Sequence, residues 1–155
     1  MKKTAIFPGS FDPFTIGHEN VVRRALDLFD NIIVAVGYNS NKKDFFSVQQ
    51  RVEWINAVFA DEPRVTVDKY EALTVDFAKT VNASHILRGI RTSADFEYER
   101  AIAQINKAMT GIDSVFLLTT PEHTPVNSSI VRDIIKHGGD ASMFLPKQIK
   151  IKLDN

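Results

Sequence analysis

The chain contains no cysteine and carries no net charge, and these two absences exclude several classes of protein. Without cysteine there can be no disulfide, no thiolate catalysis and no cysteine-based zinc or iron–sulfur site. The 19 basic and 19 acidic side chains cancel, which argues against a dedicated nucleic-acid or membrane-surface binder. We therefore expect neither a nucleic acid nor a membrane among its partners.

Long apolar runs are also lacking. No stretch approaches the roughly 18 residues that a membrane-spanning helix needs. The apolar run after Lys2 and Lys3 stops at Pro8, which is too soon for the core of a signal peptide. These features predict a cytoplasmic protein. Its 155 residues, of which 44% are hydrophobic and 25% charged, predict a single globular domain over residues 1–155.

Short aliphatic runs alternate regularly with segments of helical periodicity. We expect strands over 4–7, 32–37, 64–68, 85–88 and 114–118, and helices over 17–29, 48–59, 73–81, 94–109 and 127–137. This order predicts the α/β class, with a doubly wound five-stranded parallel sheet and helices on both faces. In such a sheet the ligand binds beyond the carboxyl ends of the strands, where the winding direction reverses.

The segment between the first strand and the first helix is the first candidate for chemistry. Gly9 and Gly17 allow close backbone approach or a positive φ, and the start of the helix offers N–H groups and the positive end of its dipole to an anion. Ser10, Thr15 and His18 crowd into the same segment. A lone histidine at a helix start is more often a surface or capping residue, and that interpretation of His18 stays open.

Cationic side chains follow two other strands. Lys42 and Lys43 come after the second strand, where a solvated pair is the commoner outcome. Arg88 and Arg91 come at the end of the fourth strand, where partial burial requires an anionic partner, and we expect phosphate rather than a carboxylate for Arg88. A second helix start at 127–129 adds hydroxyls and N–H groups, with simple N-capping as the alternative. Together these loops predict a ligand with several phosphates.

Two sets of motifs carry a family resemblance. Pro-Gly-Ser-Phe-Asp-Pro at 8–13 with Thr-Ile-Gly-His at 15–18 resembles the signature of the nucleotidyltransferase superfamily, whose motif is T/H-x-G-H. Arg-Gly-Ile-Arg at 88–91 with Asp-Phe-Glu-Tyr-Glu at 95–99 is more specific. With these motifs the chain resembles the bacterial phosphopantetheine adenylyltransferases over nearly its whole length, which implies a Rossmann-like nucleotidyltransferase fold.

The resemblance implies an enzyme that reversibly transfers AMP from ATP to 4′-phosphopantetheine, giving dephospho-coenzyme A and pyrophosphate in the penultimate step of coenzyme A synthesis. It also implies Mg²⁺ as cofactor, without assigning metal ligands, and a homohexamer. By position, His18 is the transition-state stabiliser. The implied phosphopantetheine contacts are Ser10, Lys42, Thr74 and Arg88. The implied ATP contacts are Ser10, Phe11, His18, Gly89, Ile90, Arg91, Glu99, His123, Thr124, Pro125, Val126, Asn127, Ser128 and Ser129.

The chain departs from the family pattern at three places. Ser10 stands where threonine is frequent, Asn127 replaces the first of three usual serines, and the segment 120–125 lacks an aromatic residue found in some relatives. Two other functions stay open. One is a sibling transferase with another acceptor, such as nicotinamide mononucleotide or a polyol phosphate. The other is a non-catalytic sensor of adenine nucleotides, which would be expected to lack His18 or the arginine pair.

Overall fold

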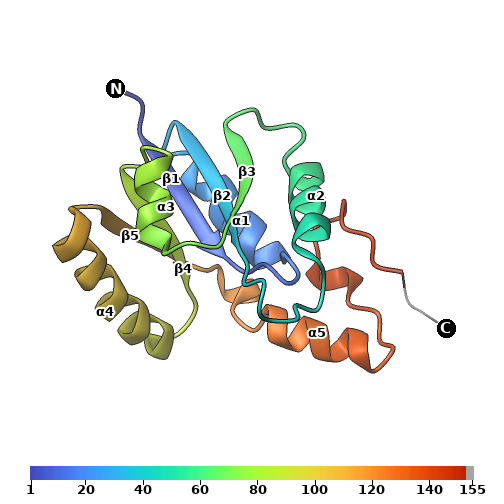
Figure 1. The fold of residues 1–155 in the computed structure, drawn as a ribbon. Helices are drawn as coiled ribbons and strands as arrows, with labels where there is room; N and C mark the ends of the chain where they lie inside the picture. Colours follow the sequence, from blue (N-terminus) through green and yellow to red (C-terminus); the bar gives the residue numbers. More distant parts are fainter. Residues whose placement is uncertain (153–155) are drawn as a thin grey trace.

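A five-stranded parallel sheet with the strand order β3-β2-β1-β4-β5 forms the centre of the computed structural model, which describes residues 1–152 (Figure 1). The strands are β1 (Thr4–Gly9), β2 (Asn31–Gly37), β3 (Val65–Tyr70), β4 (His85–Ile90) and β5 (Asp113–Leu118). The chain proceeds outward from β1 to β3 and then returns to place β4 on the other side of β1. The winding direction therefore reverses between β1 and β4, and the predicted doubly wound parallel sheet is confirmed.

Helices cover both faces of the sheet. They are α1 (Ile16–Ala25), α2 (Val48–Val58), α3 (Thr74–Thr80), α4 (Ser93–Thr110) and α5 (Ser128–Lys136), with short 3-10 turns η1 (Pro121–His123) and η2 (Ser142–Phe144). Phe7 of β1 packs into the core cluster formed with α1, α2 and α5, for example with Ile55 and Val131. Its neighbour Ile6 packs into the opposite cluster with Val75 of α3. This alternation follows from the twofold period of a strand.

The first helix is shorter than the periodicity predicts. α1 ends at Ala25 rather than Phe29, because the N–H groups of Asp27 and Leu28 bond to carbonyls three residues back and form a turn. Phe29 is nevertheless buried, so the predicted apolar face is right and the predicted boundary is wrong. β1 and β4 each run two residues beyond their predicted ends, which places Gly89 and Ile90 inside a strand.

The longest helix, α4, contacts β4 and β5 and buries none of its residues (Figure 1). Its apolar side consists of Phe96, Ile102, Ile105 and Met109, which are 38–61% exposed. The sequence leaves open whether this side packs into the core or against another subunit, and in the structure it lies outside the core.

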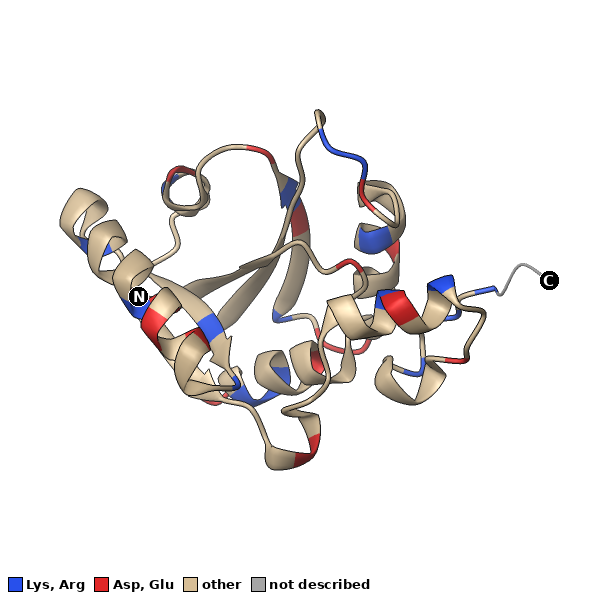
Figure 2. Cartoon of the chain, turned by 90° about the horizontal axis from the view of Figure 1, so that it is seen from below, with Lys and Arg blue, Asp and Glu red and all other residues tan. Residues whose placement is uncertain are grey.

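Charges of both signs are spread over the chain. Basic and acidic segments are interspersed along the ribbon (Figure 2). Any concentration of cations at a site is therefore local and is not part of a field that covers one whole face. Among the helices of residues 1–152, none combines the length and the apolarity that crossing a membrane requires.

Candidate active site

Two adjoining cavities open beyond the carboxyl ends of β1 and β4, where the winding direction reverses. We call the larger one, of about 1040 Å³, the first compartment, and the smaller one, of about 450 Å³, the second compartment. Both fall in the size range of small-molecule sites. The residues that line both compartments are Pro8, Gly9, Ser10, Arg88, Tyr98, Glu99 and Arg132.

The first compartment gathers all the residues predicted to contact phosphopantetheine. Ser10 and Arg88 lie where the two compartments join, whereas Lys42 and Thr74 line only the first compartment. Thr74 begins α3, and its hydroxyl lies 2.9 Å from the phenol oxygen of Tyr70 at the end of β3. Lys42 is exposed, as the solvated-pair interpretation expects, but the structure places it at the cavity.

The second compartment gathers most of the residues predicted to contact ATP. Besides Ser10 and Glu99, it is lined by Phe11, His18, Gly89, Arg91, His123, Val126, Asn127, Ser128 and Ser129. Three predicted contacts do not belong to its lining. Ile90 is buried in β4 at 4% exposure, and Thr124 and Pro125 fall outside the set of lining residues.

His18 completes a reciprocal cap at the start of α1. The Thr15 hydroxyl accepts a hydrogen bond from the His18 N–H at 3.4 Å, and the Thr15 N–H donates to His18 Nδ1 at 2.9 Å. Because a backbone N–H can only donate, Nδ1 carries no proton, and the neutral ring then carries it on Nε2. The capping interpretation of His18 is thus confirmed. The cap also selects the tautomer of a ring that lines the second compartment.

Burial keeps this imidazole neutral. The ring centroids of Phe11 and Phe14 lie 5.0 and 5.3 Å from that of His18. Burial first, and then the positive charges of Arg88 and Arg91, lower the pKa of His18 from 6.5 to about 3. At neutral pH the ring is therefore an uncharged hydrogen-bond donor.

We expect the His18 imidazole to remain neutral down to about pH 4 in the folded protein. The unfolded chain takes up a proton near pH 6.5 that the folded chain does not, so the contribution of His18 to the free energy of unfolding decreases as the pH falls from 6.5 towards 3. Nitrogen NMR of the ring measures this, with the denatured chain as control. An inflection of the His18 signals near pH 6.5 in the folded protein would contradict the assignment.

Gly9 is the position where close approach requires glycine. A Cβ built on Gly9 would lie 2.8 Å from Cζ of Phe11, a residue whose own φ of 49° is in the left-handed region. The Phe11 ring therefore packs against the strand end and beside His18 only because Gly9 has no side chain. At Gly17 a Cβ would meet no protein atom nearer than 3.5 Å, so the fold itself does not require glycine there, and close approach of a ligand at Gly17 stays a prediction.

Arg88 stands between the compartments and has a carboxylate partner. Its Nε and Nη2 donate to the two oxygens of Glu99 at 3.0 and 2.7 Å, and its Nη1 donates to the Pro8 carbonyl. The carboxylate alternative is therefore present, because α4 carries the Glu99 side chain, 12% exposed, over the end of β4, and phosphate at Arg88 stays a prediction. The Arg88 side chain is still 32% exposed and lines both cavities.

The start of α5 is capped as the simpler interpretation predicts. Asn127 Oδ1 accepts from the Ile130 N–H at 2.9 Å, and the Ser128 hydroxyl donates to the Pro13 carbonyl at 2.8 Å. Both residues also line the second compartment, and binding of an anion at this capped helix start stays a prediction.

Arg132 is a cation at the junction that the sequence analysis does not assign. Its Nη1 donates to the Asp12 carbonyl at 2.8 Å and its Nη2 to the Ser129 hydroxyl at 3.1 Å. The signal was its spacing, because a residue four positions after Ser128 lies on the same side of α5.

The carboxylates of the site do not suit a dedicated magnesium centre. Within residues 1–152, no three His, Asp or Glu side chains cluster in a way that could hold a metal ion. Asp95 and Glu99, the acidic residues that line the second compartment, already pair with Arg91 and Arg88. Magnesium sites usually combine carboxylates and water with substrate phosphates. The donors that the chain itself supplies do not fit such a site.

Known proteins share both this fold and the sequence. Residues 6–134 match the family described as cytidylyltransferase-like, which makes the chain a member of the nucleotidyltransferase class. The crystal structure of a bifunctional NMN adenylyltransferase/ADP ribose pyrophosphatase from Francisella tularensis has the same fold, with a TM-score of 0.73 at 19% identity. That similarity covers 96% of this chain but only 46% of the longer protein.

Closer sequence relatives define the family. The phosphopantetheine adenylyltransferase of Phocaeicola vulgatus is 52% identical over 149 residues, which cover 96% of this chain and 99% of the relative. That of Flavobacterium johnsoniae is 49% identical over 150 residues, 97% and 99% of the two chains. The chain belongs to the phosphopantetheine adenylyltransferase family, as its motifs predict.

Proposed function

We propose that the protein transfers the adenylyl group of ATP to 4′-phosphopantetheine and releases pyrophosphate and dephospho-coenzyme A. The observation that carries this proposal is the junction of the two compartments. Lys42 and Thr74 line only the first, His18 lines only the second, and Ser10 and Arg88 line both. Two phosphorylated molecules bound in the two compartments would therefore meet at Arg88. Membership of the family supports the same reaction.

The reaction forms one phosphorus–oxygen bond and breaks another. A phosphate oxygen of phosphopantetheine attacks the α-phosphorus of ATP. The bond from that phosphorus to the oxygen leading to the β-phosphate breaks, and its electron pair leaves with pyrophosphate. The attacking phosphate carries about two negative charges at neutral pH, so it needs no general base. A ring with a pKa of about 3 suits a donor better than a base, which agrees with this mechanism.

The barrier then depends on repulsion between two anions and on charge that shifts to the α-phosphoryl oxygens. Lys42 and Arg88 neutralise the attacking phosphate, while Arg91 and the helix start at 127–129 hold the β- and γ-phosphates. His18 donates from Nε2 to an α-phosphoryl oxygen. Catalysis consists of positioning and preorganised electrostatics, without a covalent intermediate on the protein.

Replacing Lys42 by alanine should raise the KM for phosphopantetheine on the order of 10-fold, because one charge-assisted contact to its phosphate is lost. The KM for ATP should change less than about threefold, since Lys42 lines only the first compartment. Steady-state kinetics with each substrate varied in turn measures both values. Lys79→Ala on the exposed side of α3 is the matched control and should change neither. An equal rise in both KM values in Lys42→Ala would mean that Lys42 contributes only a general positive charge to the site and does not contact phosphopantetheine specifically.

The experiment that tests the function compares acceptors. The protein is incubated with ATP, Mg²⁺ and, in separate reactions, 4′-phosphopantetheine, nicotinamide mononucleotide or a polyol phosphate, and pyrophosphate release and product mass are recorded. We expect dephospho-coenzyme A from the first reaction and little product from the others. A nucleotide product from another acceptor would favour the sibling transferase. Tight ATP binding without pyrophosphate from any acceptor would favour the sensor.

Three further features belong to this proposal. We propose that Mg²⁺ binds together with the phosphates of ATP, because the carboxylates of the site are already paired with arginines. We also propose that the protein acts in the cytoplasm, where ATP is supplied.

We also propose a homohexamer. The exposed apolar side of α4 supports a contact between subunits. The mass of the protein in solution tests the assembly, and a monomer would contradict it.

A further inference from the structure

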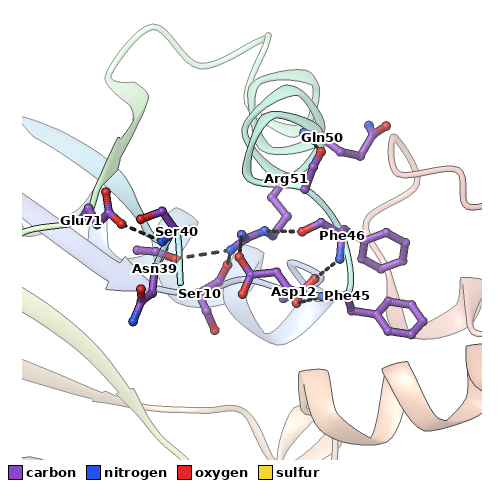
Figure 3. A network of polar contacts seen from close by, with 12 residues as sticks. Ser10, Asp12, Asn39, Ser40, Phe45, Phe46, Gln50, Arg51 and Glu71 are labelled. Carbon is purple, nitrogen blue, oxygen red and sulfur yellow. Dashed lines mark hydrogen bonds and ion pairs between the residues drawn. The ribbon is translucent and has the colours of Figure 1, made fainter. Parts of the chain in front are cut away.

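Arg51 on α2 is buried to 1% exposure, although a guanidinium group inside a protein costs free energy unless its N–H groups are bonded. Its donors reach three carbonyls and one carboxylate. Figure 3 shows Arg51 between Ser10 and Phe46. Nε donates to the Phe46 carbonyl at 3.1 Å, and Nη1 donates to the Ser10 and Gly37 carbonyls at 2.5 and 3.4 Å. Nη2 donates to Asp44 Oδ2 at 2.6 Å.

These partners belong to three parts of the chain that meet at the first compartment. They are the loop after β1, the end of β2 and the segment 38–47, which connects β2 to α2 and carries Lys42. One planar guanidinium group bonds to all three. A lysine ammonium at the end of a single stem could not reproduce this fork of donors.

The Asp12 carboxylate accepts hydrogen bonds from two backbone N–H groups of the same connecting segment. Its Oδ2 accepts from the Phe45 N–H and its Oδ1 from the Phe46 N–H, each at 2.8 Å (Figure 3). The Asp12 side chain is itself buried, with the residue only 6% exposed. Arg51 and Asp12 thus bind Phe46 on both its carbonyl and its N–H, and the later half of the segment is held from two directions.

The earlier half of the segment is held against β3. The Tyr38 N–H donates to the Tyr70 carbonyl at 3.0 Å, and the Ser40 N–H donates to Glu71 Oε1 at 2.6 Å. Lys42 therefore lies between two anchored stretches of backbone, while its own side chain stays exposed at the cavity.

We propose that Arg51 and Asp12 are positioning residues for adenylyl transfer. They fix the segment 38–47 relative to Ser10 and so hold Lys42 where the acceptor phosphate binds. This inference rests on the proposed function, in which Lys42 neutralises that phosphate. The competing possibility is that the network only stabilises the fold. The two possibilities predict different effects of the variants on the KM for phosphopantetheine. They also differ in whether those effects depend on Lys42.

The first test is the kinetics of Arg51→Lys. We expect its KM for phosphopantetheine to rise on the order of 10- to 100-fold, as for a displaced binding group, while the KM for ATP changes less than about threefold. Asp44→Asn is a milder second variant, since the Asp44 side chain is 29% exposed and the carbonyl partners of Arg51 remain. It should shift the same KM in the same direction. Lower thermal stability with unchanged KM values in both variants would overturn the proposal.

The second test asks whether Arg51 acts through Lys42. If it does, Arg51→Lys should raise the KM for phosphopantetheine far less when Lys42 is already alanine, because the group that it positions is absent. Equal effects in the two backgrounds would overturn the proposal. The matched control is Arg23→Lys on α1, whose guanidinium also donates to a backbone carbonyl, that of Val58. It lines neither compartment and should leave both KM values unchanged.

A third measurement does not depend on activity. Hydrogen exchange at the N–H groups of Phe45 and Phe46 should accelerate at least about tenfold in Asp12→Asn, because one of their two carboxylate acceptors becomes an amide nitrogen, while the N–H groups of β2 keep their protection. Unchanged exchange at both positions would contradict the anchoring. If the wild-type protein makes no dephospho-coenzyme A, the proposed function fails. If it does, and the variants behave like Arg23→Lys, only this inference fails.

Discussion

Replacing His18 by alanine is expected to lower kcat by about 10²- to 10³-fold, the usual cost of removing one preorganised donor to a transition state. The KM values for both substrates should change far less, because in the proposed mechanism the hydrogen bond from Nε2 strengthens only as charge shifts to the α-phosphoryl oxygen. The hydrogen bond that Nδ1 accepts selects the tautomer with the proton on Nε2. Because the pKa of His18 is about 3, the ring stays in this neutral form at neutral pH. Single-turnover and steady-state rates at saturating substrates measure the effect.

The control for this variant is His137→Ala, at the end of α5, whose side chain is 77% exposed and lines neither compartment. It should keep the wild-type kcat. Near-normal turnover in His18→Ala would remove the histidine from the mechanism and leave it only its capping role. A large rise in both KM values at unchanged kcat would instead make it a binding residue for the ground state.

The second large effect is expected for Arg88→Ala, which should lower kcat/KM for phosphopantetheine by about 10³-fold. Two causes combine in this variant. The cation that faces both compartments is lost, and the Glu99 carboxylate is left unpaired beside the incoming anions. The kcat/KM for ATP should also fall, in contrast to Lys42→Ala, because Arg88 lines both cavities.

Removing the unpaired charge separates these two causes. Adding Glu99→Gln to Arg88→Ala should recover part of the lost kcat/KM, since the repulsive carboxylate becomes a neutral amide. Arg100→Ala is the matched control, because Arg100 pairs with Glu97 on the exposed side of the same helix and should be without effect. If Arg88→Ala loses only thermal stability and keeps its kcat/KM, the Arg88–Glu99 pair is a structural ion pair and no more.

Hydrophobic periodicity and the alternation of strands and helices along the chain made most of the fold predictable. Short apolar runs alternate with amphipathic helices, and right-handed parallel connections leave few arrangements of such elements. The same rule places the carboxyl ends of β1, β2 and β4 at one edge of the sheet, so the sequence alone groups Ser10, Lys42 and Arg88. Their detailed roles remain predictions.

Partners that depend on how helices cross were not predictable in this way. The pairing of Arg88 with Glu99 requires α4 to lie over the end of β4, which local sequence does not specify. Arg51 is a different case, because the signal was present. It precedes the buried Ile55 and Val58 by four and seven residues, which places a charged side chain on the core side of α2. An arginine at such a position needs buried acceptors. Two of the acceptors that Arg51 finds, the Phe46 carbonyl and Asp44, belong to the segment that carries Lys42.

A structure with bound dephospho-coenzyme A tests most directly whether a donor and an acceptor phosphate meet where the two compartments join. We expect the diphosphate of this product at the junction, within hydrogen-bond reach of His18 Nε2 and the Arg88 guanidinium. The pantetheine arm should lie in the first compartment and the adenosine in the second. A product held entirely within one compartment, with its diphosphate remote from both residues, would contradict the account.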